Sequence, residues 1–181
     1  MNRVPLIDRT TVTDSRKAVL DQIPGAFGTV PNMFKATANS PAALNSMWSA
    51  FGALGGGTLG GKLAEQLAVA VADRNACHYC LAAHTALGRK AGATAEEMTQ
   101  AQAGQSADPK TQAALRFALV VVNERGQVKD TDVQAVRDAG FRDAEVVELL
   151  AHVALNPFTN YVNVALAVPV DFPGVKLHSA A

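Results

Sequence analysis

The chain has 181 residues, of which 49% are hydrophobic, so it is long and apolar enough to fold as one domain, and intrinsic disorder is excluded. Lysine and arginine together number 16, as do aspartate and glutamate. The resulting net charge of zero gives no electrostatic attraction for nucleic acid or for an anionic membrane. Aromatic residues make up only 6%, while alanine, the strongest helix former, is abundant, which favours closely packed helices.

The amino-terminal segment, MNRVPLIDRTTVTDSRK, lacks the long apolar core of a signal peptide. The longest strongly apolar run, near Phe117–Val122, is too short to span a bilayer. We therefore expect a cytoplasmic protein. In that reducing compartment the two cysteines, Cys77 and Cys80, are expected to be redox-active or metal-binding and not a static disulfide.

The first part of the chain is expected to hold short helices separated by clear breaks. Residues 1–30 form an amino-terminal arm, extended to about residue 13, followed by one short helix that Pro24-Gly25 ends. Two further helices are predicted, one from Asn32 to Ala38 and one that starts at Ser40-Pro41 and ends near Leu54.

Residues 55–61 read GGGTLGG and, with Lys62, superficially match a phosphate-binding loop. The next residue is Leu63, where such a loop needs the serine or threonine that holds magnesium, and no strand precedes it. We interpret this stretch as a flexible connector.

The rest of the chain shows helix signals in close succession. Residues 60–92 are expected to form a helical hairpin closed by a glycine, and Thr94 with Glu97 forms a capping box for the next helix. Four more helices are predicted, from Asp108-Pro109 to about Glu124, from Asp130 to Ala139-Gly140, from Asp143 to Asn156-Pro157, and from Phe158 to about Ala167. We find no convincing strand, so the predicted fold class is all-α.

The hairpin of residues 60–92 is expected to turn at Asp73-Arg74-Asn75, because Asp and Asn favour caps and turns. With Asn75 as the N-cap of the second helix, Glu65 and His84 are equally far from the midpoint of the turn, so their side chains should face each other. Cys77 then falls in the first turn of that helix, where unpaired N–H groups and the helix dipole favour a thiolate.

Three side chains suited to sulfur chemistry share one face of the second helix. Cys77, Cys80 and His84 are three and four residues apart, spacings that return to the same side of a helix, whereas His78 points elsewhere. We predict a hydrogen-bonded series from Glu65 to His84 to Cys80, with Cys77 one turn below.

A second stretch echoes this spacing. Glu148, Asn160 and Asn163 are separated as the glutamate and the two cysteines of the hairpin are. On this basis we interpret residues 143–168 as a degenerate second hairpin, in which residues 148–167 would superpose on residues 65–84. A helix–turn–helix pattern shared without duplication is the alternative interpretation.

The pattern Glu-x11-Cys-x2-Cys-x3-His resembles the alkylhydroperoxidase AhpD-like branch of the carboxymuconolactone decarboxylase superfamily. The segments VPNMFKATANSPAAL and VPVDFP resemble its peroxidase-related subgroup, so the resemblance extends from about Val30 to Pro173. It implies one AhpD-like domain over residues 1–181, built of helical hairpins that assemble as trimers or hexamers. It also implies an antioxidant thiol peroxidase that needs no bound cofactor and takes electrons from an external dithiol, such as a lipoylated protein.

Carried over to this chain, the resemblance implies that Cys80 attacks the peroxide, that Cys77 resolves the product into a disulfide, and that Glu65 and His84 form a proton relay. The superfamily's lactone decarboxylases lack the cysteine pair, which argues against that reaction here.

One position departs from the family pattern. The best-understood members carry another histidine two residues after the first cysteine, where this chain has Tyr79. The Tyr79 hydroxyl is a candidate accessory group, and so is the neighbouring His78, although it lies on another side of the helix.

Elementary chemistry supports the same reaction. A peroxide bond is cleaved by a thiolate, and a free cysteine has a pKa of about 8.5, so a base must assist. His84, oriented by Glu65, can accept the proton of Cys80. The sulfenic acid that forms can condense with Cys77, because Cα atoms three apart on a helix lie about 5 Å from each other, inside the range of disulfides.

Other interpretations of these residues are open. Cys77 and Cys80 could be small buried hydrophobes, or could bind zinc together with Glu65 and His84. A third candidate is a disulfide-exchanging or redox-responsive protein with negligible peroxide turnover. His152 is expected to be a core or subunit-contact histidine. Four aromatic residues are expected to serve packing: Trp48, Phe51, Phe117 and Phe158.

Overall fold

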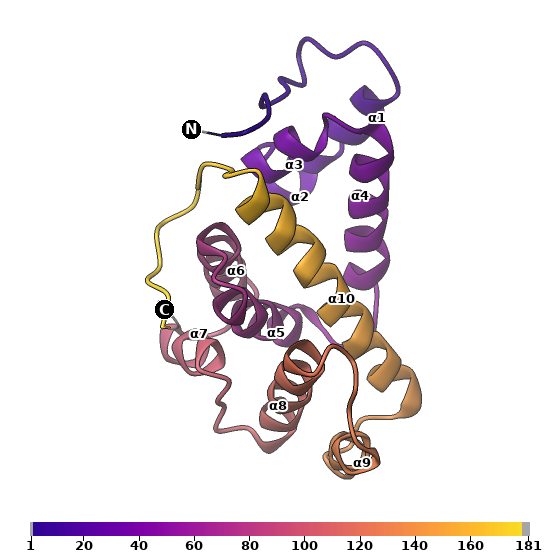
Figure 1. Cartoon of the computed structure of the whole chain (residues 1–181), viewed down its shortest axis with the longest axis vertical. Coiled ribbons are helices and arrows are strands. Elements are labelled where there is room, and N and C mark those ends of the chain that lie inside the picture. The colour runs from indigo at the N-terminus through magenta and orange to yellow at the C-terminus, as the bar shows by residue number, and fades with distance from the viewer. Residues whose placement is uncertain (1, 179–181) are drawn as a thin grey trace.

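A computed structural model describes residues 2–178, and within that range the chain forms ten α-helices and no strand (Figure 1). The predicted all-α class is confirmed. The helices are α1 (Arg16–Leu20), α2 (Ile23–Phe27), α3 (Asn32–Thr37), α4 (Pro41–Gly55), α5 (Gly61–Arg74), α6 (His78–Lys90), α7 (Ala95–Gln102), α8 (Pro109–Asn123), α9 (Asp130–Asp138) and α10 (Asp143–Ala165).

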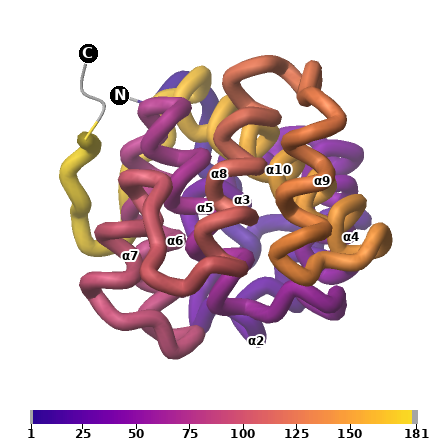
Figure 2. Tube along the Cα trace, turned by 90° about the horizontal axis from the view of Figure 1, so that it is seen from below, coloured from indigo at the N-terminus to yellow at the C-terminus, as the bar shows by residue number. Residues whose placement is uncertain are grey.

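Helix α5 is at the centre of the packing. Every residue from Gln66 to Asp73 is buried, and the helix contacts α6, α7, α8 and α10. Helix α6 is the second arm of the predicted hairpin, and the long helix α10 passes between that hairpin and helices α3 and α4 (Figures 1 and 2). Side chains on α10 can therefore reach the hairpin from outside it.

Most predicted helix starts are confirmed by their caps. The Ser40 hydroxyl accepts the N–H of Ala43, and Asp108 accepts the N–H of Thr111. Thr94 forms the expected capping box with its partner three residues later. These caps satisfy backbone N–H groups that have no partner inside their helices.

The prediction that Pro24-Gly25 ends the helical part of residues 1–30 is wrong. Ile23–Phe27 is a short helix, α2, with Pro24 in its first turn and Gly28 at φ 78° as its C-cap. A proline is tolerated there because the N–H that it lacks has no intrahelical partner at that position.

The second hairpin predicted over residues 143–168 is also wrong, because α10 is one continuous helix that contains Pro157. The proline removes a backbone hydrogen bond, and local side chains bond to the backbone around it. Asn156 donates to the carbonyl of His152 at 2.9 Å, and Thr159 donates to the carbonyl of Asn156 at 2.9 Å.

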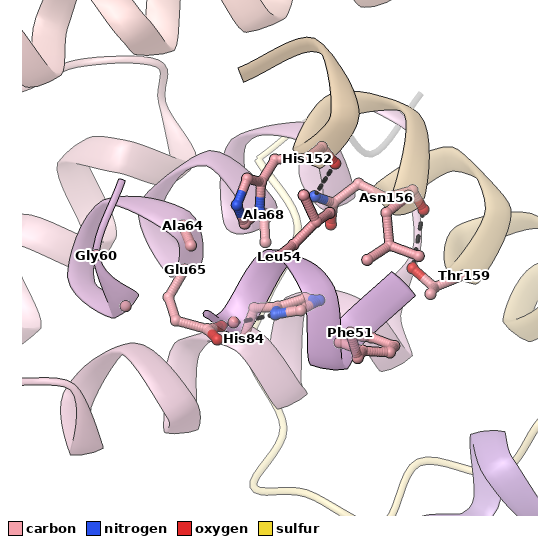
Figure 3. A pocket seen from close by; sticks show the side chains of 13 residues that line it. Phe51, Leu54, Gly60, Ala64, Glu65, Ala68, His84, His152, Asn156 and Thr159 are labelled. Carbon is pink, nitrogen blue, oxygen red and sulfur yellow. Dashed lines mark hydrogen bonds and ion pairs between the residues drawn. The ribbon is translucent and has the colours of Figure 1, made fainter. Parts of the chain in front are cut away.

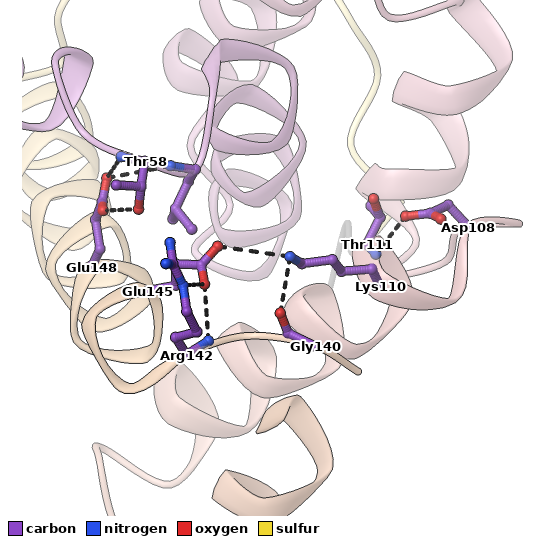
Figure 4. A network of polar contacts seen from close by, with 9 residues as sticks. Thr58, Asp108, Lys110, Thr111, Gly140, Arg142, Glu145 and Glu148 are labelled. Carbon is purple, nitrogen blue, oxygen red and sulfur yellow. Dashed lines mark hydrogen bonds and ion pairs between the residues drawn. The ribbon is translucent and has the colours of Figure 1, made fainter. Parts of the chain in front are cut away.

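The glycine-rich connector is anchored to α10. Glu148 accepts the backbone N–H of Thr58 at 2.7 Å and its hydroxyl at 2.6 Å (Figure 4). The carboxylate lies against Gly57, where any Cβ would overlap it. One turn earlier, Glu145 contacts Arg142 and Lys110 (Figure 4). The connector is thus held where its lack of side chains lets the carboxylate approach.

The described ends of the chain pack on the far end of α10 and on the hairpin. Arg3 donates its backbone N–H to Leu166 and its guanidinium to Ala165, both at 2.8 Å. Near the carboxyl end, Asp171 accepts the N–H of Asn32, and the ring of Phe172 packs edge-on against Tyr79. Within residues 2–178, no helix combines the length and apolarity needed to cross a bilayer.

Candidate active site

The turn between α5 and α6 sets the position of both sulfur atoms. Asn75 is the C-cap of α5 and not the predicted N-cap of α6; that cap is Cys77, whose sulfur accepts the N–H of Cys80 at 3.2 Å. Ala76 has φ 51°, which turns the chain sharply enough to bring the cysteine to the start of the helix. Cys77 therefore lies just before the first turn of α6.

The two cysteines are free thiols whose sulfur atoms touch. Cys77 Sγ donates to Cys80 Sγ at 2.6 Å, and the residues are 0% and 1% exposed. The backbone already brings the sulfurs together, so that a disulfide can form with local adjustment.

The predicted pairing of Glu65 with His84 is confirmed. Glu65 Oε2 lies 2.7 Å from His84 Nδ1, and both side chains are largely buried. Burial alone would lower the pKa of His84, but the charge and hydrogen bond of Glu65 raise it above its ordinary value. The carboxylate therefore favours the imidazolium and fixes its orientation.

The predicted hydrogen bond from His84 to Cys80 is not among those that the described residues form. The Cys80 sulfur is instead hydrogen-bonded to Cys77 and to the carboxamide of Asn163, which donates to it at 3.2 Å. His84 acts on this sulfur through its charge, and both residues line the same cavity.

The two thiols differ in acidity. Burial alone would raise the pKa of Cys80, but the hydrogen bond from Cys77 and the charge of His84 outweigh it and lower that pKa from 9.0 to about 6. The carboxamides of Asn163 and Asn160 act in the same direction. The bond that Cys77 donates, together with burial, raises the pKa of Cys77. Cys80 is therefore the thiolate at neutral pH.

The two accessory candidates lie in different surroundings. His78 is the exposed first residue of α6. Tyr79 is buried, its hydroxyl accepts the N–H of Met33 at 3.2 Å, and it lines the cavity beside Cys80. Burial and the nearby Asp171 carboxylate raise the pKa of Tyr79, so that its phenol stays neutral.

Two cavities meet at His84. One, of about 20 Å³, is almost wholly apolar and is lined by Cys80 and Tyr79 together with aromatic side chains. The other, of about 140 Å³, is lined by Glu65 and by His152, Asn156 and Thr159 from α10 (Figure 3). The imidazole thus lies between a confined space beside the thiolate and a larger cavity whose lining includes polar side chains.

Sequence reasoning missed the place of four residues in this region. His152 is only 8% exposed, as expected for a core residue, yet it lines the larger cavity and its Nε2 has no hydrogen-bond partner among the described residues. Burial lowers the pKa of His152. Asn160 and Asn163 had been singled out by their spacing, but as a trace of duplication. Phe51, expected only to pack, lines both cavities.

The zinc interpretation finds no support in the geometry. Among the described residues, no group of three or more His, Cys, Asp or Glu side chains converges as metal ligands do. Glu65 pairs with the Nδ1 of His84, while the sulfurs contact each other and an amide.

Comparison with known proteins gives one family and one fold. Residues 41–120 match the carboxymuconolactone decarboxylase family. No curated protein matches the chain. Among solved structures, a peroxidase-related protein from Silicibacter sp. TM1040 is 24% identical, with a TM-score of 0.80 over 97% of this chain and 92% of that one.

Two other solved structures share the fold. An alkylhydroperoxidase AhpD core protein from Ralstonia eutropha JMP134 is 24% identical, with a TM-score of 0.85 over 94% of this chain and 92% of that one. The debrominase Bmp8, in complex with 2,3,4-tribromopyrrole, is 16% identical, with a TM-score of 0.75 over 94% of each chain. At these identities the likeness establishes the fold.

Proposed function

We infer that the chain is a member of the carboxymuconolactone decarboxylase superfamily, because residues 41–120 match that family and the chain has the AhpD-like fold; on that premise we propose that it is a thiol-dependent hydroperoxide reductase. The observation that carries the proposal is a buried pair of touching thiols of unequal acidity, one of them beside a carboxylate–imidazole pair. Perturbed pKa values of this kind cluster at functional sites.

In the first step the Cys80 thiolate attacks the terminal oxygen of the hydroperoxide. The S–O bond forms as the O–O bond breaks, and the leaving alkoxide takes a proton from the imidazolium of His84, which Glu65 has kept charged. The products are a sulfenic acid on Cys80 and an alcohol, so that sulfur is oxidised and the peroxide is reduced by two electrons.

In the second step the Cys77 sulfur, already in contact, attacks the sulfenic acid. A disulfide forms, and the hydroxyl leaves as water with the thiol proton of Cys77. An external dithiol then opens the disulfide through a mixed disulfide and is itself oxidised. A lipoylated protein is a partner of suitable chemistry. Tyr79 is neutral and lines the same cavity, but its hydroxyl proton is engaged by the Asp171 carboxylate, so it would assist as a hydrogen-bond donor only after leaving that partner.

The apolar cavity beside Cys80 favours small alkyl hydroperoxides as substrates. Its lining includes Phe27, Phe34 and Phe172, and its volume of about 20 Å³ accommodates little more than a hydroperoxyl group unless these side chains move. We therefore assign the hydroperoxyl end of the substrate to this cavity.

Self-association and a cytoplasmic location are part of the same proposal. Helix α10 exposes a row of apolar side chains spaced three, eleven and three residues apart: Val147, Leu150, Tyr161 and Val164. A helix face of this kind favours burial against another protein, here a second copy of the chain in a trimer or hexamer.

Rapid mixing of the reduced protein with an alkyl hydroperoxide tests the function. We expect the loss of two thiols per chain, and multiple turnovers when dihydrolipoamide is supplied. Cys80→Ser should abolish this turnover, because the hydroxyl is too weak an acid to form the nucleophile at neutral pH. Retained turnover in that variant would remove Cys80 from the mechanism. Oxidation by disulfides but not by peroxide would favour the disulfide-exchanging protein instead.

A further inference from the structure

Helix α10 contributes two carboxamides to the buried sulfur cluster. Asn163 is 3% exposed, lines the small cavity, and donates its Nδ2–H to Cys80 Sγ at 3.2 Å. Asn160, one turn earlier on the same face, is 0% exposed, and its Oδ1 accepts a hydrogen bond from Asn75 at 2.8 Å. Asn75 belongs to the turn that leads into the cysteines, so that α10 and the turn are joined at this point.

Both carboxamides have capacity left over. The Oδ1 of Asn163 is fully buried and has no hydrogen-bond partner among the described residues. The Nδ2 of Asn160 is also fully buried and makes no hydrogen bond of ordinary length there, yet it acts as a donor toward the Cys80 sulfur and lowers the pKa of Cys80. A buried polar atom without a partner is costly, and such atoms call for a specific explanation. Here both atoms belong to carboxamides that act on the reactive sulfur, and that sulfur changes its charge and its substituents during the proposed cycle.

We propose that Asn163 is a catalytic residue that holds the Cys80 sulfur in its thiolate form and then receives the hydroxyl of the sulfenic acid, with Asn160 as the positioning residue beside it. The Nδ2–H of Asn163 stabilises the negative sulfur before attack. After attack the new S–O–H group has a proton to donate, and the unpaired Oδ1 of Asn163 is the acceptor. This second part rests on the proposed function; the first does not.

The same contact favours the reduced protein. A thiolate is a strong acceptor for the Asn163 N–H, whereas a neutral disulfide sulfur is a weak one. Stabilising the dithiol form makes the disulfide more oxidising, and hence easier for an external dithiol to reduce. This hydrogen bond comes from α10, whereas the charged groups near the sulfur belong to the hairpin.

Alkylation of Cys80 by iodoacetamide as a function of pH, followed by peptide mass spectrometry, tests the thiolate role without any peroxide. In Asn163→Ala we expect the midpoint of the profile to rise by about one to two pH units, as for loss of a hydrogen bond to a charged group; at pH 7 this is about a twofold to tenfold loss of thiolate. Asn163→Asp should raise it further, because it places a carboxylate beside the sulfur.

Thr37→Val is the matched control. Thr37 is also buried, and its hydroxyl donates to a backbone carbonyl and lies 3.8 Å from the sulfur of Met47. None of these contacts involves either cysteine. The substitution Thr37→Val removes a buried hydroxyl that makes no contact with Cys80, so the alkylation profile of this variant should match that of the parent protein. Thermal unfolding of each variant identifies any that fail to fold, and Asn163→Ser, which keeps a small donor, then replaces Asn163→Ala with a smaller expected shift.

The disulfide potential is the second measurement, taken by equilibration with a dithiol buffer. Asn163→Ala should make it more negative, by about 30 mV for each tenfold loss of stabilisation of the reduced form. Unchanged alkylation profiles in Asn163→Ala and Asn163→Asp, in folded protein, would overturn the proposal. Failure of the parent protein to turn over peroxide, with the alkylation shifts present, would overturn the peroxidase function but not the thiolate role.

Discussion

The α5/α6 hairpin and helix α10 carry similar residue spacings and use them in opposite ways. In the hairpin the chain doubles back, so Glu65 and His84, nineteen residues apart, meet at 2.7 Å. In α10 the helix continues through Pro157, and Glu148 lies twelve residues, about 18 Å of helix, from Asn160. A spacing thus has chemical meaning only together with the path of the chain.

The two regions also supply different chemistry. The hairpin brings the ionisable groups: two thiols, a carboxylate and an imidazole. Helix α10 brings neutral amides to the sulfurs and a histidine of lowered pKa, His152, to the larger cavity. Glu148 of α10, the counterpart of Glu65 in the echoed spacing, anchors the glycine-rich connector. Acid–base function should therefore reside in the hairpin, and a substitution that removes one of its ionisable groups should have the largest effect on the reaction rate.

Glu65→Gln should lower the rate of peroxide-dependent thiol loss by at least about 100-fold. The amide keeps the shape of the carboxylate but cannot hold His84 as a cation, so the leaving alkoxide loses its proton donor. Stopped-flow oxidation under single-turnover conditions measures the effect. Glu148→Gln, at the corresponding place in the echoed spacing, is the control and should leave the rate unchanged; equal losses in both variants would erase the distinction between the two regions.

The next largest effect is expected in the pH dependence of Cys80 alkylation. With the pKa of Cys80 lowered to about 6, its alkylation rate should level off above pH 7 and fall tenfold per pH unit well below 6. In Glu65→Gln the midpoint should move upward, because His84 is then more readily neutral and its charge no longer favours the thiolate. A midpoint near that of an ordinary thiol in the parent protein would contradict the arrangement.

The free energy of unfolding should also depend on the ionisation of Cys80. Because folding lowers the pKa of Cys80 from 9.0 to about 6, its contribution is complete above pH 9 and is lost as the pH falls through 6. The difference in unfolding free energy between the parent and Cys80→Ser should therefore grow with pH inside that window, by at most about 1.4 kcal/mol per unit. Urea unfolding at several pH values measures it, and a difference that shrinks as the pH rises would have the wrong sign.

The smallest effect is expected at the anchor of the connector. Glu148→Ala removes hydrogen bonds to the backbone and hydroxyl of Thr58 and should lower the free energy of unfolding by about 1–2 kcal/mol. Peroxide turnover per folded molecule should stay at the parent level. Urea denaturation and single-turnover kinetics on the same sample check both halves, and a loss of turnover larger than the loss of folded protein would place Glu148 in the reaction.

Much of the fold and part of the candidate site could be predicted from local sequence rules. Caps at Ser40, Thr94 and Asp108 act on their own helices, so propensity alone identified them. The Glu65–His84 pair followed from symmetry about one short turn, a distance too small for errors to accumulate.

The rest depended on packing between distant segments. The continuity of α10 through Pro157 is stabilised by its contacts on both sides, which no proline rule describes. The N-cap role of Cys77 required the positive φ of Ala76, an uncommon backbone state for a residue that is not glycine. The Asn163–Cys80 contact joins residues 83 positions apart, and their spacing alone could not show that α10 crosses the hairpin there.

The sealing of Cys77 has a consequence for the pace of the whole cycle. Peroxide needs only the small cavity at Cys80, but a dithiol on a carrier protein must reach a disulfide whose two residues are 0% and 1% exposed. Both sulfur atoms are buried, so attack by a carrier-bound dithiol on either of them would require the fold to open locally first. Oxidation by peroxide would thus be fast and reduction of the disulfide slow, with local opening around the cysteines as the rate-limiting step.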